Sequence, residues 1–217
     1  MKFLTATFAS LALSASAAHA DYLTQTCEEA VALSALPAQL RAGSSVYVLT
    51  ETGFKKTIEG NGPFTCIVER NHPNAIIPQC LDTEGARTII PAIQHRTLMA
   101  MRGETAANIS QDFHERAANG EYSAPKSIGV NYMMSHYNYI YIRSMKQIMR
   151  IPPHLMHYAP HVTDKDVGAV EGAQQKGLPH IGDPGIHGYF ISFVESPASP
   201  SDVMNSCKGQ IAENPPS

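Results

Sequence analysis

The sequence has no tryptophan, few charged residues, and none of the common motifs of nucleotide or hydrolytic chemistry. Charged residues make up 16% of the chain, whereas soluble domains usually contain ~25%. A P-loop and a Gly-x-Gly-x-x-Gly loop are both missing, which argues against nucleotide binding through a glycine-rich loop. His-Glu-x-x-His and Gly-x-Ser-x-Gly are missing too, so neither a zincin metalloprotease nor a serine hydrolase of the nucleophile-elbow type is indicated.

Basic stripes and long apolar runs are missing as well. The 16 Lys and Arg and the 19 Asp and Glu are scattered, for a formal net charge of -3. A protein that follows a phosphate backbone needs clustered basic side chains, so nucleic-acid binding is not expected. After residue 20, no segment reaches the length of continuous apolar sequence that crosses a bilayer, so we expect no membrane insertion once the N-terminal segment is removed.

The N-terminal segment has the order of features of a secretory signal. Lys2 supplies a positive charge, an apolar stretch follows, and Ala18-His19-Ala20 gives the small-x-small pattern that signal peptidases cleave. We expect cleavage after residue 20. The exported chain then covers residues 21–217, and the protein is secreted or periplasmic.

The four cysteines of the chain predict two disulfides. An even number of cysteines in an exported protein favours pairing, and three pairings are open. We favour Cys66 with Cys80, because the loop between them is short, and Cys27 with Cys207, which would join the two ends of the domain. No Cys-x-x-Cys motif occurs, so a thiolate zinc site has little support.

The pattern of apolar residues predicts a single α+β domain over residues 21–217. A helix is expected at about 27–36, followed by an antiparallel β-meander of strands at 46–50, 54–59 and 64–70. Residues 71–83 are expected to form a loop. Two helical segments follow, at about 85–102 and 104–118, and we expect the helices to pack on one face of the sheet.

The C-terminal half is expected to be rich in loops. Residues 129–150 fit either a strand or a helix, with a helical end after residue 143. Short strands are predicted at 155–158 and 189–194. The Ser- and Pro-rich tail, about 197–217, is expected to be loosely ordered except near Cys207.

Five histidines of the C-terminal half are the candidates for a metal site: His154, His157, His161, His180 and His187. Neutral imidazole is a good ligand for zinc and related metals. On a helix His154 and His157 would share a face, but Pro160 opposes a helix, and on a strand they point to opposite faces. A loop would have to bring the histidines together. The alternative is that they are partly buried, hydrogen-bonded loop residues.

A run of alternating tyrosines, Tyr137, Tyr139 and Tyr141, is the candidate ligand-binding surface. Tyrosine rings are common at binding surfaces because they are both apolar and polar. The competing interpretation is a strand that packs its aromatic face on the core.

Two functions remain open from the sequence. The first is a non-catalytic ligand-binding or interaction domain that requires no cofactor, and it is favoured because no catalytic signature is found. The alternative is a metal-dependent hydrolase that uses zinc or a similar transition metal held by the histidine-rich segment 154–187. The sequence indicates neither a partner nor a substrate.

Overall fold

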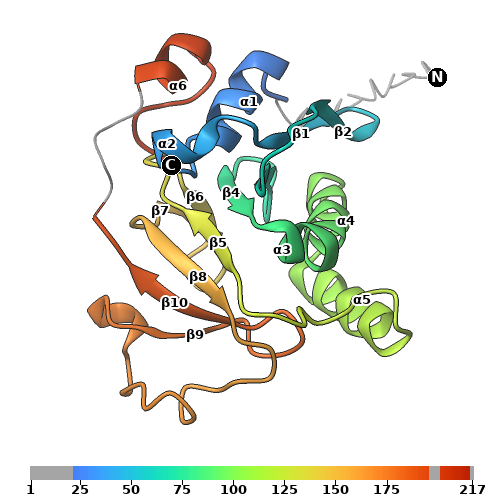
Figure 1. Cartoon of the computed structure of the whole chain (residues 1–217), viewed down its shortest axis with the longest axis vertical. Helices are drawn as coiled ribbons and strands as arrows, with labels where there is room; N and C mark the ends of the chain where they lie inside the picture. The colour runs from blue at the N-terminus through green and yellow to red at the C-terminus, as the bar shows by residue number, and fades with distance from the viewer. Residues whose placement is uncertain (1–21, 196–200, 216–217) are drawn as a thin grey trace, which may run out of the picture.

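The computed structural model describes residues 22–195 and 201–215. The predicted signal, residues 1–20, lies outside this range. The described chain has the predicted α+β class, with helices and an extended sheet packed together (Figure 1). None of the described helices is long and apolar enough to cross a membrane.

The helices lie in three groups along the chain. The helices are α1 (Gln25–Leu33), α2 (Ala38–Arg41), α3 (Thr83–Thr88), α4 (Ile90–Met101), α5 (Ala106–Ala118), the 3-10 helix η1 (Gln174–Lys176) and α6 (Ser201–Ser206). Asp82 begins α3 by accepting a hydrogen bond from the Gly85 N–H, and Thr105 caps α5 through the Asn108 N–H. Pro91 lies in the first turn of α4, where a missing N–H costs nothing, so the long helix predicted at 85–102 is two helices.

The strands alternate with these helices along the chain. They are β1 (Ser45–Thr50), β2 (Gly53–Ile58), β3 (Thr65–Glu69), β4 (Ile77–Leu81), β5 (Val130–Met133), β6 (Tyr139–Ile142), β7 (Gln147–Arg150), β8 (His154–Tyr158), β9 (His180–Gly182) and β10 (Tyr189–Phe193). Within the described residues, eight of them form one sheet in the order β2-β1-β3-β4-β5-β8-β10-β9, and β6 pairs with β7 in a separate hairpin.

Two parts of the sheet differ from the pattern expected from the sequence. The third strand, β3, pairs in parallel with β1 through Ser45↔Thr65 and Val46↔Cys66, so the three strands do not follow a simple meander. The predicted loop 71–83 contains a complete strand, β4. Proline is rare inside sheets because it has no N–H to donate to a neighbouring strand. On the β5 side, β4 pairs only through Cys80 and Leu81, so Pro78 has a strand neighbour on one side only, β3.

The ambiguous region 129–150 is extended, and the helix expected after residue 143 is strand β7. Lys146 adopts a φ of 50° in the turn between β6 and β7, a conformation that closes tight hairpins. The apolar residues Ile148 and Met149 fit helix and strand equally well by spacing, so pairing with β6 decides between them.

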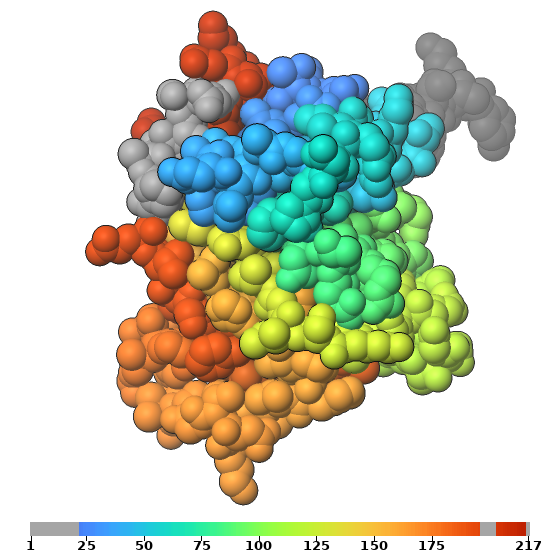
Figure 2. Space-filling model, in the orientation of Figure 1, coloured from blue at the N-terminus to red at the C-terminus, as the bar shows by residue number. Residues whose placement is uncertain are grey.

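Helices cover both faces of the first half of the sheet. On β3, Cys66 and Val68 belong to the core under α1 and α6, whereas Ile67 between them belongs to the core under α3 and α4. Successive side chains of a strand point to opposite faces, so the two cores lie on opposite faces of β3. The second half of the sheet is flanked by long connections, and the segment around residues 160–180 projects at the end of the molecule away from α1 and α6 (Figure 2).

Both disulfides favoured from the sequence are present, and none of the described cysteines is free. Cys66 and Cys80 are directly opposite each other on β3 and β4. Cys27 and Cys207 join α1 to the segment after α6. Two disulfides are typical of proteins that fold in an oxidising compartment.

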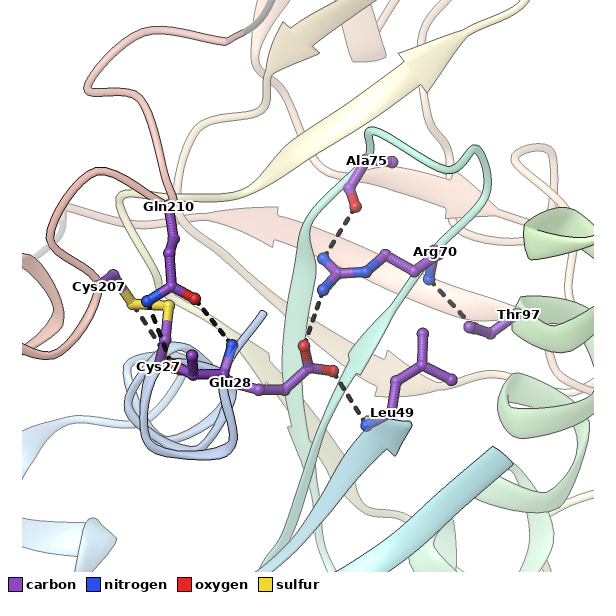
Figure 3. A network of polar contacts seen from close by, with 9 residues as sticks. Cys27, Glu28, Leu49, Arg70, Ala75, Thr97, Cys207 and Gln210 are labelled. Atoms are coloured by element: carbon purple, nitrogen blue, oxygen red, sulfur yellow. Dashed lines mark hydrogen bonds and ion pairs between the residues drawn. A yellow bond between two sulfur atoms is a disulfide. The ribbon is translucent and has the colours of Figure 1, made fainter. Parts of the chain in front are cut away.

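A buried ion pair lies beside the second of these disulfides (Figure 3). Arg70 Nη2 donates to Glu28 Oε2 at 2.8 Å, and the two side chains are 4% and 1% exposed. Glu28 also accepts from the Leu49 N–H, and Arg70 Nη1 donates to the Ala75 carbonyl. The pair therefore connects α1, β1 and the end of β3.

Candidate functional site

The strongest candidate site is a cavity of about 180 Å³ between α5, the neighbouring α4, and the turn that leads into β10. Figure 1 shows α5 next to this turn. Ligand pockets for drug-sized molecules usually measure ~300–1,000 Å³, so this cavity suits a small ligand. Its lining consists of Arg96, Phe113, His114, Ala117, His161, Asp183, Pro184, Gly185, Ile186, His187 and Tyr189.

The turn at 183–188 gives the cavity its shape. Asp183 has a φ of 49° and Gly185 a φ of 146°, conformations that ordinary side chains rarely adopt. The Gly185 carbonyl accepts hydrogen bonds from the N–H groups of His161 and Gly188, at 2.7 and 3.1 Å. A Cβ on Gly188 would lie 2.7 Å from the Ala159 carbonyl oxygen, so only glycine fits there. The turn is thus fixed against the segment that follows β8.

His187 forms the buried wall of the cavity. Its Nε2 lies 3.1 Å from the carbonyl oxygen of Ser123, and because a carbonyl only accepts, Nε2 carries the proton. Burial lowers the pKa of His187 to about 4, so the ring is neutral at pH 7 and Nδ1 is left with a lone pair. That Nδ1 is buried and has no hydrogen-bond partner among the described residues. An unmatched buried acceptor costs about 1–3 kcal/mol, and a donor that reached this atom would remove that cost.

Arg96 brings a positive charge to the cavity. Its Nη2 donates to Glu69 Oε1 at 3.2 Å, and its side chain remains 26% exposed. Glu69 in turn accepts from Gln79 at 2.7 Å, and Gln79 accepts from Asn131 at 2.6 Å. This row of polar side chains crosses β3, β4 and β5 and holds Glu69 in place. Glu69 in turn positions the guanidinium of Arg96 through their ion pair.

An aromatic wall completes the cavity. The ring of Phe113 lies 5.4 Å from that of His187 and 5.6 Å from that of Tyr122, and the Arg96 guanidinium lies 5.5 Å from the Phe113 centroid. Burial raises the pKa of Tyr189, so its hydroxyl stays protonated and able to donate. The cavity therefore combines a cation, an apolar wall and buried hydrogen-bonding groups.

The five candidate metal ligands lie in three separate places. His154 and His180 are buried on one face of the sheet, with ring centroids 5.8 and 6.0 Å from Phe193. His157 points to the opposite face of β8. His161 and His187 line the cavity. In residues 22–195 and 201–215 no three His, Cys, Asp or Glu side chains form a group suited to a metal ion.

The separation of the histidines follows from strand geometry. Residues 154–158 form a strand, so neighbouring positions alternate between faces, and His161 lies beyond the strand with a φ of 63°. His154 and His180 each place Nδ1 against the carbonyl oxygen two residues earlier, at 2.8 and 3.0 Å. Two histidines fall short of the three or four protein ligands that zinc sites use.

The three candidate tyrosines do not form an open platform. Tyr137 and Tyr139 are 1% and 0% exposed, and both belong to the core under α1. Tyr139 donates from its hydroxyl to the carbonyls of Ala212 and Glu213, while Tyr141 stacks on His72 at 4.4 Å. Tyr137 and Tyr139 are therefore packed inward, and Tyr141 is half-buried.

A larger surface depression, about 530 Å³, lies near the turn after β2. Among its lining side chains, Arg41 donates to the Leu36 carbonyl at 3.0 Å and Ser44 to that of Leu40 at 3.1 Å. Because these groups bond to the chain itself, this depression offers less for a ligand to bind than the cavity at His187.

Sequence reasoning singled out His161 and His187 but did not connect them with Arg96. One signal was available: Arg96 lies three positions after Ile93 and four before Ala100, both buried, and so falls near the apolar face of its helix. A charged residue on such a face indicates a buried partner or a site. Arg96 and the turn at 183–188 line the same cavity although they are nearly 90 residues apart, and no local sequence pattern indicates that they meet.

Comparison of the chain with protein-family models, curated proteins and solved structures found no match.

We expect acid to destabilise the fold through His187. Its folded pKa of about 4 lies below the ordinary 6.5, so the unfolded chain binds more protons between these values. The stability contributed by neutral His187 is complete above pH 6.5 and is lost as the pH falls towards 4. Guanidinium unfolding at pH 7 and pH 5 measures this loss. The His187→Gln variant, which keeps an N–H donor for Ser123, should lose less stability between the two pH values. Equal losses in both proteins would contradict the assignment.

Proposed function

We propose that the protein is an exported, non-catalytic binding domain whose ligand is a small polar molecule held in the cavity at His187. The observation that carries the proposal is a cavity that brings the Arg96 guanidinium, the aromatic ring of Phe113 and the buried ring of His187 together, with His187 Nδ1 left without a hydrogen-bond partner among the described residues. A ligand N–H or O–H that reaches this atom removes the cost of leaving it unsatisfied. Binding of this kind needs no metal.

Export is part of the proposal. Residues 1–20 have the secretory pattern, and the two disulfides agree with an oxidising compartment. A secreted or periplasmic binding domain with a small, largely preformed cavity accounts for these features together with the rigid turn at 183–188.

Filling the cavity tests the proposal. Ala117 on α5 lines the cavity, and its neighbour Ala118 is exposed outside it, so Ala117→Trp and Ala118→Trp form a matched pair. Oxidised, isotope-labelled protein would be screened by NMR against a library of small organic fragments. We expect fragments to shift resonances of the lining residues. Their affinity should fall roughly tenfold or more in Ala117→Trp, because the indole occupies the ligand's space.

The Ala118→Trp protein should bind the same fragments as the wild type. The proposal would be overturned if no fragment perturbed the lining residues, or if Ala117→Trp bound as tightly as the wild type. Thermal unfolding of both variants establishes that each is folded during the measurement.

A further inference from the structure

The cavity presents a positive group with unused donors. Of the N–H groups of Arg96, only one at Nη2 has a protein partner, the Glu69 carboxylate, within the described chain. A guanidinium carries five N–H donors in a planar fork that matches a carboxylate. Glu69 is itself held by Gln79 through its other oxygen, so it does not swing across to take up the remaining donors.

A negative group lines the same cavity. Asp183 is exposed at the cavity mouth, and its carboxylate makes no hydrogen bond or ion pair with any described residue. It lies close enough to Arg96 to help raise the pKa of that guanidinium, yet the two do not form an ion pair. Its left-handed backbone and the Pro184-Gly185 turn fix it at this position.

The opposed charges select the class of ligand. A simple anion would satisfy Arg96 and be repelled by Asp183, and a simple cation would do the reverse. A molecule with a carboxylate and an ammonium group matches both, and its N–H donors can also satisfy the Nδ1 acceptor of His187. The cavity of about 180 Å³ limits the ligand to a small molecule, and Phe113 provides an apolar wall for its carbon atoms.

We propose that this cavity binds a free α-amino acid, with the ligand carboxylate at Arg96 and the ligand ammonium at Asp183. The inference rests on the proposed function and specifies its ligand. It assigns two separate roles to the two charges: each recognises one end of the same ligand.

Calorimetric titration of the oxidised protein with each of the common free amino acids tests the assignment. The strongest binder is then compared with its own amide, which lacks the carboxylate, and with its N-acetyl derivative, which lacks the ammonium. We expect each derivative to bind roughly tenfold more weakly or worse, because each loses a charge-assisted interaction.

Variants connect each end of the ligand with its residue. In Asp183→Asn, the preference for the free amino acid over the N-acetyl derivative should disappear, while the preference over the amide remains. In Arg96→Gln the pattern should reverse. Glu51→Gln, in the exposed turn between β1 and β2, is the control and should bind like the wild type. Asp183 is exposed, so Asp183→Asn should fold normally. It therefore tests the proposal even if Arg96→Gln disturbs the fold.

The outcomes separate the two proposals. If fragments bind in the cavity but no amino acid does, the ligand class is wrong and the binding function stands. If amino acids bind but the amide and N-acetyl forms bind equally well, the roles of Arg96 and Asp183 are wrong. If neither fragments nor amino acids bind, both proposals fail.

Discussion

Replacing Arg70 with methionine is expected to destabilise the fold by about 3–5 kcal/mol, the range measured when one partner of a buried ion pair is removed. Arg70 and Glu28 are almost completely buried, and their contact joins α1 to the end of β3. In the variant, the Glu28 carboxylate keeps the Leu49 N–H as its remaining hydrogen-bond donor. Arg70→Met also removes the donor to the Ala75 carbonyl.

The pH dependence of this loss identifies its cause. Burial already raises the pKa of Glu28, and Arg70 partly offsets that effect. Without Arg70 the carboxyl takes up a proton more readily, so the penalty in Arg70→Met should shrink as the pH is lowered from 7 to 5. Guanidinium unfolding measures the difference in the free energy of unfolding at each pH.

Two comparisons control the experiment. The double variant Glu28→Gln/Arg70→Met removes the stranded charge, so it should be more stable at pH 7 than Arg70→Met alone. Arg87→Met breaks an ion pair on the surface, with Glu84, and should change stability little. A loss below 1 kcal/mol in Arg70→Met, or a double variant no more stable than the single one, would show that the pair does not act as described.

Loss of the Cys27–Cys207 disulfide is the second large effect. The two cysteines are 180 residues apart, so in the chain-entropy model the bond removes about 5 kcal/mol of unfolded-state freedom. The Cys66–Cys80 bond closes a much shorter loop, with a separation of 14, which corresponds to about 3 kcal/mol. Replacing both cysteines of the long loop with alanine should therefore cost more than the same change in the short one.

The two double-alanine variants are controls for each other. All four cysteines are buried, at 0–3% exposure, so the local packing changes are alike and the loop length differs. Chemical unfolding of the two variants in parallel measures the order of stabilities. A Cys66→Ala/Cys80→Ala protein less stable than the Cys27→Ala/Cys207→Ala protein would contradict the entropic explanation.

Local patterns in the sequence predicted the elements whose signal is local. The strands predicted at 46–50 and 54–59 correspond to β1 and β2. The disulfide pairs followed from loop length and export. Strand β4 was not predicted, because Pro73 and Pro78 indicate a loop and only the partner strands show that Pro78 is tolerated. Likewise, pairing with β6 makes β7 a strand.

The candidate site was predicted only in part, because it too depends on contacts between distant parts of the chain. The histidine-rich segment drew attention to His161 and His187, which do lie together at the cavity. Because residues 154–158 form strand β8, His154 and His157 point to opposite faces of the sheet, and residue spacing alone does not predict that conformation. Arg96 and Phe113 come from helices that lie far from both histidines in the sequence, so their contribution depends on tertiary packing.

The central claim is that the cavity at His187 binds a ligand, and the ring nitrogens of His187 report on it most directly. Long-range proton–nitrogen NMR spectra of histidine-labelled protein would be recorded without ligand and with a saturating fragment or amino acid. We expect a neutral ring with the proton on Nε2 and an Nδ1 resonance that moves as it gains a donor, while the resonances of His72, which does not line the cavity, stay in place. An Nδ1 resonance of His187 that none of these molecules moves would contradict the account.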